Sequence, residues 1–312
     1  MATSGSIDFS VSRDDIITEA LEQMGVLAEG QSPSADQLTS MARTLNMLVK
    51  TWQADGLNLF AVQKLYVYLE ASKSEYSLSS TTTDHFSAEY NRTTLSVAGV
   101  ATDSTVTVTT VTGIADGDYI GIKLDDGTMD WTTVNGAPAG SVVILTAALT
   151  GAAASGNTVY HYTSKANRPM RIANVVMSDA VSEQDTPIGT MSRQEYIELP
   201  NKGADGSVNQ VYYDPQVGTG VLYVWPQADD ADKYLTIWVQ RTLEDFDAAS
   251  DNADFPQEWY LPLALNLAAI SCTKYGVHRF ERSQINQLAA MYLRLAQSFD
   301  IEDGFQFQPE NM

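Results

Sequence analysis

The chain has 312 residues, enough for one large or two moderate domains, and 44% of them are hydrophobic, which is typical of a folded globular protein. It has 18 Lys and Arg against 39 Asp and Glu, so the formal charge is −21 and the clustered cations that grip nucleic-acid phosphates are missing. Because no run of about 18 apolar residues occurs and the N-terminus has no basic start before an apolar run, we expect neither a membrane span nor a secretory signal.

The N-terminal part predicts two helices that form an antiparallel hairpin. Each begins with a capping pair and then carries apolar residues at every third or fourth position until a glycine ends it. The first helix is predicted from Ser12, Asp15, Ile16, Ile17, Ala20, Leu21, Met24 and Gly25, and the second from Ser34, Gln37, Leu38, Met41, Leu45, Leu48, Trp52 and Gly56.

From Val62 the apolar pattern changes to every second residue, which indicates β-strands and continues almost to Arg241. Within this region residues 80–165 are unusually rich in Thr, Val, Gly and Ala and contain close turn signals, so we expect an inserted small β-domain. The hairpin signals are Asp126 with Gly127 and Asn135 with Gly136, and further strands are expected at 208–213, 221–224 and 234–240.

The C-terminal part returns to a helical pattern. Asp254 is expected to cap a helix that has Pro256 in its first turn and Gln257 at the capping-box position. This helix is apolar on most of its circumference as far as Gly276, which predicts burial against other helices. A last helix is predicted over 285–299, and its apolar residues are expected to pack against the other helices. They include Ile285, Leu288, Ala289, Leu295 and Ala296.

Together these patterns predict an α+β fold. The terminal helices are expected to form a helical bundle, and a central antiparallel β-domain to carry an inserted small β-barrel or sandwich. The expected boundaries are 1–61 with 254–299 for the bundle, 62–79 with 166–253 for the β-domain, 80–165 for the insertion and 300–312 for a C-terminal arm.

Few residues could carry chemistry. The three histidines, His85, His161 and His278, have no metal-ligand spacing, and the single cysteine, Cys272, lies in an apolar helical stretch as a core residue would. No nucleophile elbow or phosphate-binding loop is present. We therefore expect no catalytic residue, no metal and no cofactor.

Three acidic clusters leave alternatives open. The first fits a hairpin turn better than a calcium site, because the EF-hand spacing is missing, and the second is expected to be a solvated turn. The third could serve glycoside cleavage if tryptophans lined a cleft, although the strand spacing of those tryptophans favours core packing. The clusters are Asp125, Asp126 and Asp130; Asp229, Asp230 and Asp232; and Glu244, Asp245 and Asp247, and the tryptophans are Trp131, Trp225 and Trp238.

Both ends of the chain and part of its middle carry a resemblance to a known family. The residues are Ile16 to Met24, Met47, Leu48, Trp52, Asp55 and Gly56; Asp254 to Trp259, Ala264, Leu267, Ala268, Tyr275 and Gly276; and the stretches 168–172, 196–202, 212–215 and 222–226. In these parts the chain resembles the head-to-tail adaptors of short-tailed phages, the tail tubular protein A group and the related packaged-DNA stabilisation proteins. The segment 80–165 goes beyond the shorter members of that group.

The resemblance implies a structural virion protein and not an enzyme. It implies a ring of about twelve copies at the head-to-tail junction of the virion, assembled in the host cytoplasm. The helical part would meet the portal protein and the β-part the tail nozzle protein, with a tail fibre as a further candidate partner. Genomic DNA would pass through the lumen without sequence-specific binding. Within the C-terminal arm, Ile301, Phe305 and Phe307 are candidate portal contacts.

Two other functions remain as alternatives. A receptor-binding or fibre-like tail module would account for the Thr-rich insertion, but long repeats and coiled-coil heptads are missing from the sequence. A glycan-cleaving virion enzyme would account for the many carboxylates and tryptophans.

Overall fold

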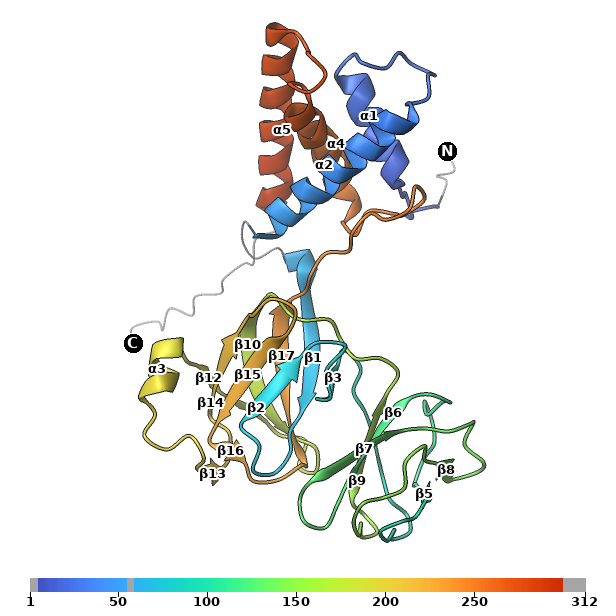
Figure 1. Cartoon of the computed structure of the whole chain (residues 1–312), viewed down its shortest axis with the longest axis vertical. Coiled ribbons are helices and arrows are strands. Elements are labelled where there is room, and N and C mark those ends of the chain that lie inside the picture. Colours follow the sequence, from blue (N-terminus) through green and yellow to red (C-terminus); the bar gives the residue numbers. More distant parts are fainter. Residues whose placement is uncertain (1–4, 55–58, 300–312) are drawn as a thin grey trace, which may run out of the picture. The chain divides into compact units, whose positions relative to one another are not determined.

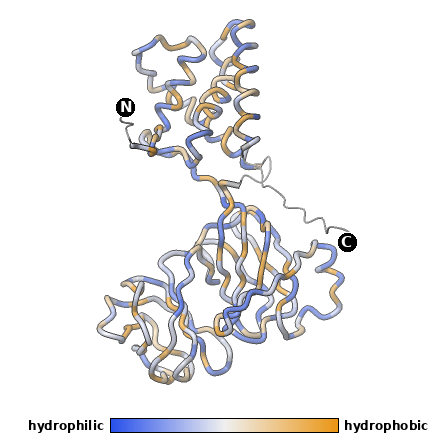
Figure 2. The backbone as a smooth tube through the Cα atoms, turned by 180° about the vertical axis from the view of Figure 1, so that it is seen from behind, coloured by the Kyte–Doolittle hydropathy of each residue, from blue (hydrophilic) through white to orange (hydrophobic). Residues whose placement is uncertain are grey.

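The computed structural model describes residues 5–54 and 59–299, and it is a mixed α+β protein, as the sequence predicts at that level. The described residues form five α-helices and several sheets, in which most strand pairs are antiparallel. The chain divides into two compact units (Figure 1), a helical unit made from the chain before Val62 and after Thr242, and a β unit made from Val62–Thr242. Hydrophobic and hydrophilic residues interchange along both units (Figure 2), and no helix in the described ranges is long and apolar enough to cross a membrane.

In its described part, the helical unit contains the α-helices α1 (Arg13–Gln23), α2 (Ala35–Ala54), α4 (Tyr260–Ser271) and α5 (Arg279–Phe299). They share one hydrophobic core, and α4 contacts each of the other three. Helix α4 can lie between the other helices because it is apolar on most of its circumference, as predicted, and seven of its 12 residues are buried. The rings of Trp52, Phe255 and Trp259 pack against one another in the same core, with centroids 5.8 to 6.2 Å apart.

The predicted starts of the first two helices are confirmed. At α1, the Ser12 side chain accepts a hydrogen bond from the backbone N–H of Asp15, and the Asp15 carboxylate accepts one from the backbone N–H of Ser12. Ser34 and Gln37 make the same reciprocal pair at α2. These bonds satisfy backbone donors that have no partner inside the helix.

The predicted start of the third helix is wrong. A 3₁₀ turn, Gln257–Trp259, precedes α4, which begins at Tyr260, so Asp254 lies too far ahead to cap the first turn of α4. Its carboxylate instead accepts a hydrogen bond from the backbone N–H of Glu244. Helix α4 also ends at Ser271, before the expected Gly276, which has a φ of +67° in the turn that leads to α5.

Two sheets form the main part of the β unit, and residues from both belong to one hydrophobic core. The predicted strands near 208–213, 221–224 and 234–240 are confirmed with shifts of a few residues. The first sheet has the order β11 (Asp185–Pro187), β10 (Arg171–Asp179), β17 (Lys233–Gln240), β1 (Val62–Tyr68) and β3 (Phe86–Ser87). The second has the order β12 (Gly189–Thr190), β14 (Gln210–Asp214), β15 (Gly220–Trp225) and β2 (Glu75–Leu78), and a short parallel pair consists of β13 (Asp205–Gly206) and β16 (Gln227–Ala228).

Helix α3 (Arg193–Glu198) lies in a region for which the sequence pattern indicates strands, so that prediction is wrong there. A capping box between Ser192 and Glu195 starts the helix, and none of its residues is buried. The capping pair was visible in the sequence, but no apolar stripe followed it.

Most of the segment 80–165 forms sheets of its own, with a separate hydrophobic core. The predicted turn at Asp126 and Gly127 is confirmed, and Gly127 adopts a φ of +86° that favours glycine. Strand β3 at 86–87 still pairs with β1, so the separate sheets begin later than residue 80. Their strands are β4 (Asn91–Thr94), β9 (Thr158–Tyr162), β6 (Tyr119–Lys123) and β7 (Met129–Thr133) in one sheet, and β5 (Thr105–Thr107) and β8 (Val142–Ile144) in a second.

Candidate functional site

An apolar stripe on the surface of α5 is the first candidate. Ile285, Ala289 and Ala296 lie on the buried side of this helix. On its outer side four large apolar side chains are exposed, and three of them follow the spacing of one helix face. This α5 stripe consists of Phe280 (66% exposed), Leu288 (42%), Met291 (54%) and Leu295 (62%).

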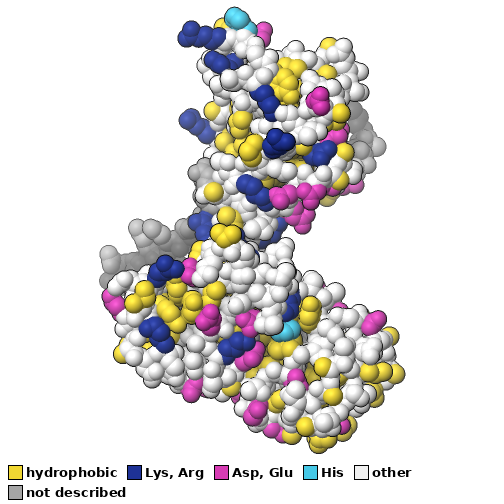
Figure 3. Space-filling model, viewed as in Figure 1, with side chains coloured by type: hydrophobic (Ala, Val, Ile, Leu, Met, Phe, Trp, Pro, Cys, Tyr) yellow, Lys and Arg dark blue, Asp and Glu magenta, His cyan; other side chains and the backbone are white. Residues whose placement is uncertain are grey.

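Basic residues accompany the α5 stripe, although the chain as a whole is strongly acidic. Helix α5 carries three arginines, Arg279, Arg282 and Arg294, against one acidic residue, Glu281. In the space-filling view, hydrophobic and basic side chains lie together over the helical unit (Figure 3). Helix α1 has the opposite balance of charge, because its sequence contains four acidic residues and one arginine. The helical unit therefore carries an apolar and basic helix as well as an acidic one.

The candidate portal contacts predicted from the sequence, Ile301, Phe305 and Phe307, lie outside the described residues.

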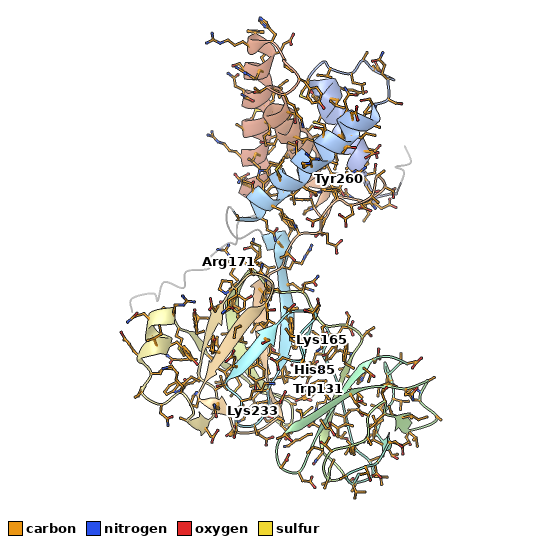
Figure 4. All side chains as sticks on the ribbon, viewed as in Figure 1. His85, Trp131, Lys165, Arg171, Lys233 and Tyr260 are labelled. Carbon is orange, nitrogen blue, oxygen red and sulfur yellow. The ribbon has the colours of Figure 1, made fainter. Side chains whose placement is uncertain are left out.

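A cavity of about 600 Å³ in the β unit is the second candidate. Its walls come from the turn after β1, the loop before β3, strands β6 and β7, and the segment that leads from β9 to β10. His85, Trp131 and Lys165 from three of these parts lie close together (Figure 4). The lining residues are Glu70, Lys73, Thr82, Thr83, Asp84, His85, Tyr119, Met129, Trp131, Thr132, Thr133 and Lys165.

One side of this cavity is an aromatic stack. The His85 imidazole lies parallel to the Trp131 ring, with centroids 3.9 Å apart. A side chain at Gly121 would collide with that tryptophan ring, so glycine lets the neighbouring strand approach it. His85 Nδ1 shares a hydrogen bond of 2.6 Å with the Tyr162 hydroxyl. Burial, then the charges of Lys165 and Lys73, lower the pKa of His85 to about 3, so the ring is neutral at pH 7.

The other side of the cavity is ionic. The Lys73 ammonium lies 3.0 Å from the Glu70 carboxylate and 2.6 Å from the Asp84 carboxylate. Burial lowers the pKa of Lys73, but its hydrogen bonds and ion pairs with Asp84 and Glu70 raise it by more, and the net shift is upward. Lys73 is thus a neutralised cation in the wall.

Lys165, the other lysine of the cavity, has no ion pair of this kind within the described residues. Its ammonium donates hydrogen bonds to the backbone carbonyls of Thr82 (2.6 Å) and Thr83 (3.2 Å) and lies 5.2 Å from the centre of the Tyr119 ring. Among the described residues no carboxylate lies within ion-pair distance of it. Burial lowers the pKa of Lys165, and the more distant Asp84 opposes that shift.

The other residues singled out from the sequence lie at separate places in the fold. Cys272 is buried in the helical core, as predicted, and burial raises the pKa of its thiol. His161 is buried in β9, and His278 accepts a hydrogen bond from the backbone N–H of Phe280. Asp245 pairs with Lys50 at 2.7 Å.

Two expectations about the acidic clusters have clear outcomes. Asp126 lies in the expected hairpin turn and accepts a hydrogen bond from the backbone N–H of Thr128, while Asp125 and Asp130 accept hydrogen bonds from the loop between β8 and β9. In the described ranges no three His, Cys, Asp or Glu residues are grouped to hold a metal ion. The second expectation, a solvated turn at Asp229 to Asp232, is wrong for Asp230 and Asp232. Both carboxylates pair with Lys123, at 2.7 and 2.5 Å, which joins this turn to strand β6 of the inserted segment.

All three tryptophans are half-buried. Trp131 packs against a hydrophobic cluster that contains Tyr68 and Tyr162, as expected, whereas Trp225 and Trp238 belong to no hydrophobic cluster of the described residues, contrary to expectation. The three tryptophans also lie on different strands, β7, β15 and β17, and only Trp131 lines the cavity. Trp225 donates a hydrogen bond to the Asn201 carbonyl, and Trp238 has the Lys64 ammonium 5.6 Å from its ring centre. They therefore do not form a common cleft.

The sequence pattern missed the cavity because its walls are far apart in the chain. His85 and Lys165 are 80 residues apart, and neither belongs to a recognisable motif. The α5 stripe was also missed: Leu288 and Leu295 were expected to face the core, yet the side of α5 toward the core is set by Ile285, Ala289 and Ala296.

No protein-family model matches this chain. No curated protein matches it significantly either.

Proposed function

We propose that this chain is a structural virion protein, a ring-forming head-to-tail adaptor that joins the portal of a short-tailed phage to its tail nozzle. The α5 stripe carries the proposal. Four exposed large apolar side chains on one helix are unfavourable in water, and contact with another protein surface would remove them from it. An adaptor needs such contacts because it binds copies of itself and a portal.

The charges of the helical unit support a head-to-tail contact between copies. In a closed ring each copy uses two different surfaces, one for each neighbour. The arginines of α5 in one copy and the acidic residues of α1 in the next would attract each other, while the α5 stripe supplies apolar area. Other acidic surfaces would repel, so the portal serves as the template on which copies gather.

The finer arrangement belongs to the same proposal. The four terminal helices act as a bundle that faces the portal, and the C-terminal arm adds Ile301, Phe305 and Phe307 as portal anchors. The β unit, with its insertion as a small barrel or sandwich, faces the nozzle and a tail fibre. Acidic lumen walls let DNA pass without sequence-specific binding, because they offer few cations for its phosphates.

The test combines mass measurement with electron microscopy. The purified chain alone is expected to be a monomer, and with purified portal protein from the same phage it is expected to form a ring beneath the portal. A stable ring in the absence of portal would contradict the templated mechanism, and no ring with portal would contradict the adaptor function.

A pair of variants connects this test to the α5 stripe. Met291→Ser together with Leu295→Ser should abolish the ring on the portal. The matched control is Gln284→Ser with Gln287→Ser, which introduces serine at two exposed polar positions of the same helix and should leave the ring intact. Because these four positions are exposed, folding stability should change by no more than about 0.5 kcal/mol at each, apart from the small helix propensity cost of serine.

A further inference from the structure

The cavity beside His85 has features that the adaptor function does not require. It lies entirely within the β unit, and its volume of about 600 Å³ falls in the range of about 300–1,000 Å³ typical of ligand pockets. Nine of its 12 lining residues are charged or hydroxyl-bearing, which does not suit a purely apolar ligand.

Several hydrogen-bonding groups of the lining remain free. Within the described chain, the only hydrogen bond of the His85 ring is the one shared between Nδ1 and the Tyr162 hydroxyl, so Nε2 has no partner among the described residues. The Thr83 hydroxyl likewise makes no hydrogen bond to a described residue. Thr132 accepts one from the backbone N–H of Ala147 and can still donate its own hydrogen. Neutral donors and acceptors of this kind match the hydroxyl groups of a sugar.

The charges of the lining select among polar ligands. Glu70 and Asp84 already neutralise Lys73, whereas Lys165 uses two of its three N–H donors on carbonyls and keeps one. A single carboxylate on the ligand would pair with this third donor. The two carboxylates and two ammonium groups of the lining have formal charges that cancel, so a phosphate dianion would leave two net negative charges beside Glu70 and Asp84, whereas a single carboxylate would leave one.

We propose that this cavity binds a sugar residue that carries one carboxylate, of the sialic acid or uronic acid type. The carboxylate pairs with Lys165, the hydroxyls bond to Thr83, Thr132 and His85 Nε2, and the apolar face of the sugar lies against Met129 and the edge of Trp131. This is a binding site, with no bond made or broken. It does not depend on the adaptor proposal.

The experiment measures binding of acidic trisaccharides by saturation-transfer NMR and calorimetry. The probes are 3′-sialyllactose and a trisaccharide ending in glucuronic acid, each compared with its carboxylate methyl ester. At least one acidic probe is expected to bind, and its neutral ester to bind about tenfold more weakly or worse, because a charge-assisted hydrogen bond is lost. Binding of neither acidic probe, or equal binding of acid and ester, overturns the proposal.

Variants assign the binding to this cavity. Lys165→Gln should weaken the acidic probe about tenfold and leave the ester unaffected, while Lys233→Gln, which removes a lysine outside the lining (Figure 4), should change neither. If Lys165→Gln does not fold, Thr83→Trp provides the second variant, since Thr83 is exposed at the cavity and a bulky ring there should block it. Unchanged binding in a folded variant of either kind would contradict the assignment.

Discussion

The helical unit and the β unit bury their apolar residues in different ways. The helical unit draws the two ends of the chain into one core around α4 and leaves the α5 stripe exposed. The β unit is made from one continuous stretch of chain and divides its buried residues among separate clusters, with ion pairs between its parts. An exposed apolar stripe is typical of protein-binding surfaces, whereas a polar cavity is typical of small-ligand sites.

Contacts between the inserted segment and the main sheets hold the β unit together at a junction between these two parts. A tyrosine-rich cluster lies there, in which the Tyr68 ring of β1 stacks on Tyr162 of β9 at 5.7 Å and lies 4.8 Å from Tyr160. The Lys123 ion pairs with Asp230 and Asp232 belong to the same junction. Aromatic packing of this kind adds stability beyond that from the buried area alone.

The largest effects are expected from substitutions in the two cores. Leu267→Ala in α4 and Ile237→Ala in β17 each remove a fully buried aliphatic side chain and should lower the free energy of unfolding by about 2–5 kcal/mol. Each should mainly affect the unit in which it lies, because the two residues belong to separate hydrophobic clusters. Urea unfolding followed by NMR signals assigned to each unit would measure both transitions.

Equal shifts of both transitions by either variant would mean that the units unfold as one. A Leu261→Ala variant serves as the control. Leu261 lies in the same helix as Leu267 but is 43% exposed, so its substitution should lower the free energy of unfolding much less than Leu267→Ala.

The next effect is a pH dependence that belongs to the β unit. Because burial holds the pKa of His85 at about 3, the folded chain keeps the ring neutral, whereas an unfolded histidine binds a proton below about pH 6.5. The unfolded state therefore binds more protons between these values, and stability should fall as the pH falls from about 6.5 toward 3, by at most about 1.4 kcal/mol per pH unit.

His85→Gln should remove this contribution. Unfolding free energies measured by urea at pH 7 and pH 5 should differ less in the variant than in the parent chain. His161, whose pKa burial also lowers, remains in both chains, so a residual dependence is expected. An unchanged difference between the two pH values would show that His85 titrates normally in the folded chain.

Sequence patterns located the elements well where one periodicity persists. The stripes of α1 and α2 and the alternation of β1 and β17 follow from which side chains must be buried. The same logic failed for α3, which has no buried residue and is held by its cap, and for α4, where a 3₁₀ turn displaces the start. Local signals without burial are weak predictors.

Neither the cavity nor the α5 stripe could be predicted from sequence patterns, because both depend on tertiary packing. The cavity brings together His85, Trp131 and Lys165, and their proximity depends on strand pairings between distant segments. In α5 the sequence offers more apolar residues than one face can bury, and only tertiary packing decides that Ile285 is buried and Leu295 exposed. Turn chemistry, in contrast, is local, and the Asp126 and Gly127 hairpin was predictable.

The smallest expected change in stability comes from removing a helix cap, and the same capping box occurs once in each unit. Ser12→Ala removes the cap of α1, whose apolar side is buried, and should lower the free energy of unfolding by about 0.5–2 kcal/mol. Ser192→Ala removes an equivalent cap from α3, which has no buried residue, so that helix can fray without disturbing a core and global stability should change less.

The hydrogen bonds from Ser12 also hold the pKa of Asp15 below its usual value, so the Ser12 contribution is present near neutral pH and should fade as the pH falls below about 4. Thermal unfolding of both variants at pH 7 and pH 3 measures this difference, and an equal loss from the two caps at pH 7 would mean that α3 is as integral to its unit as α1.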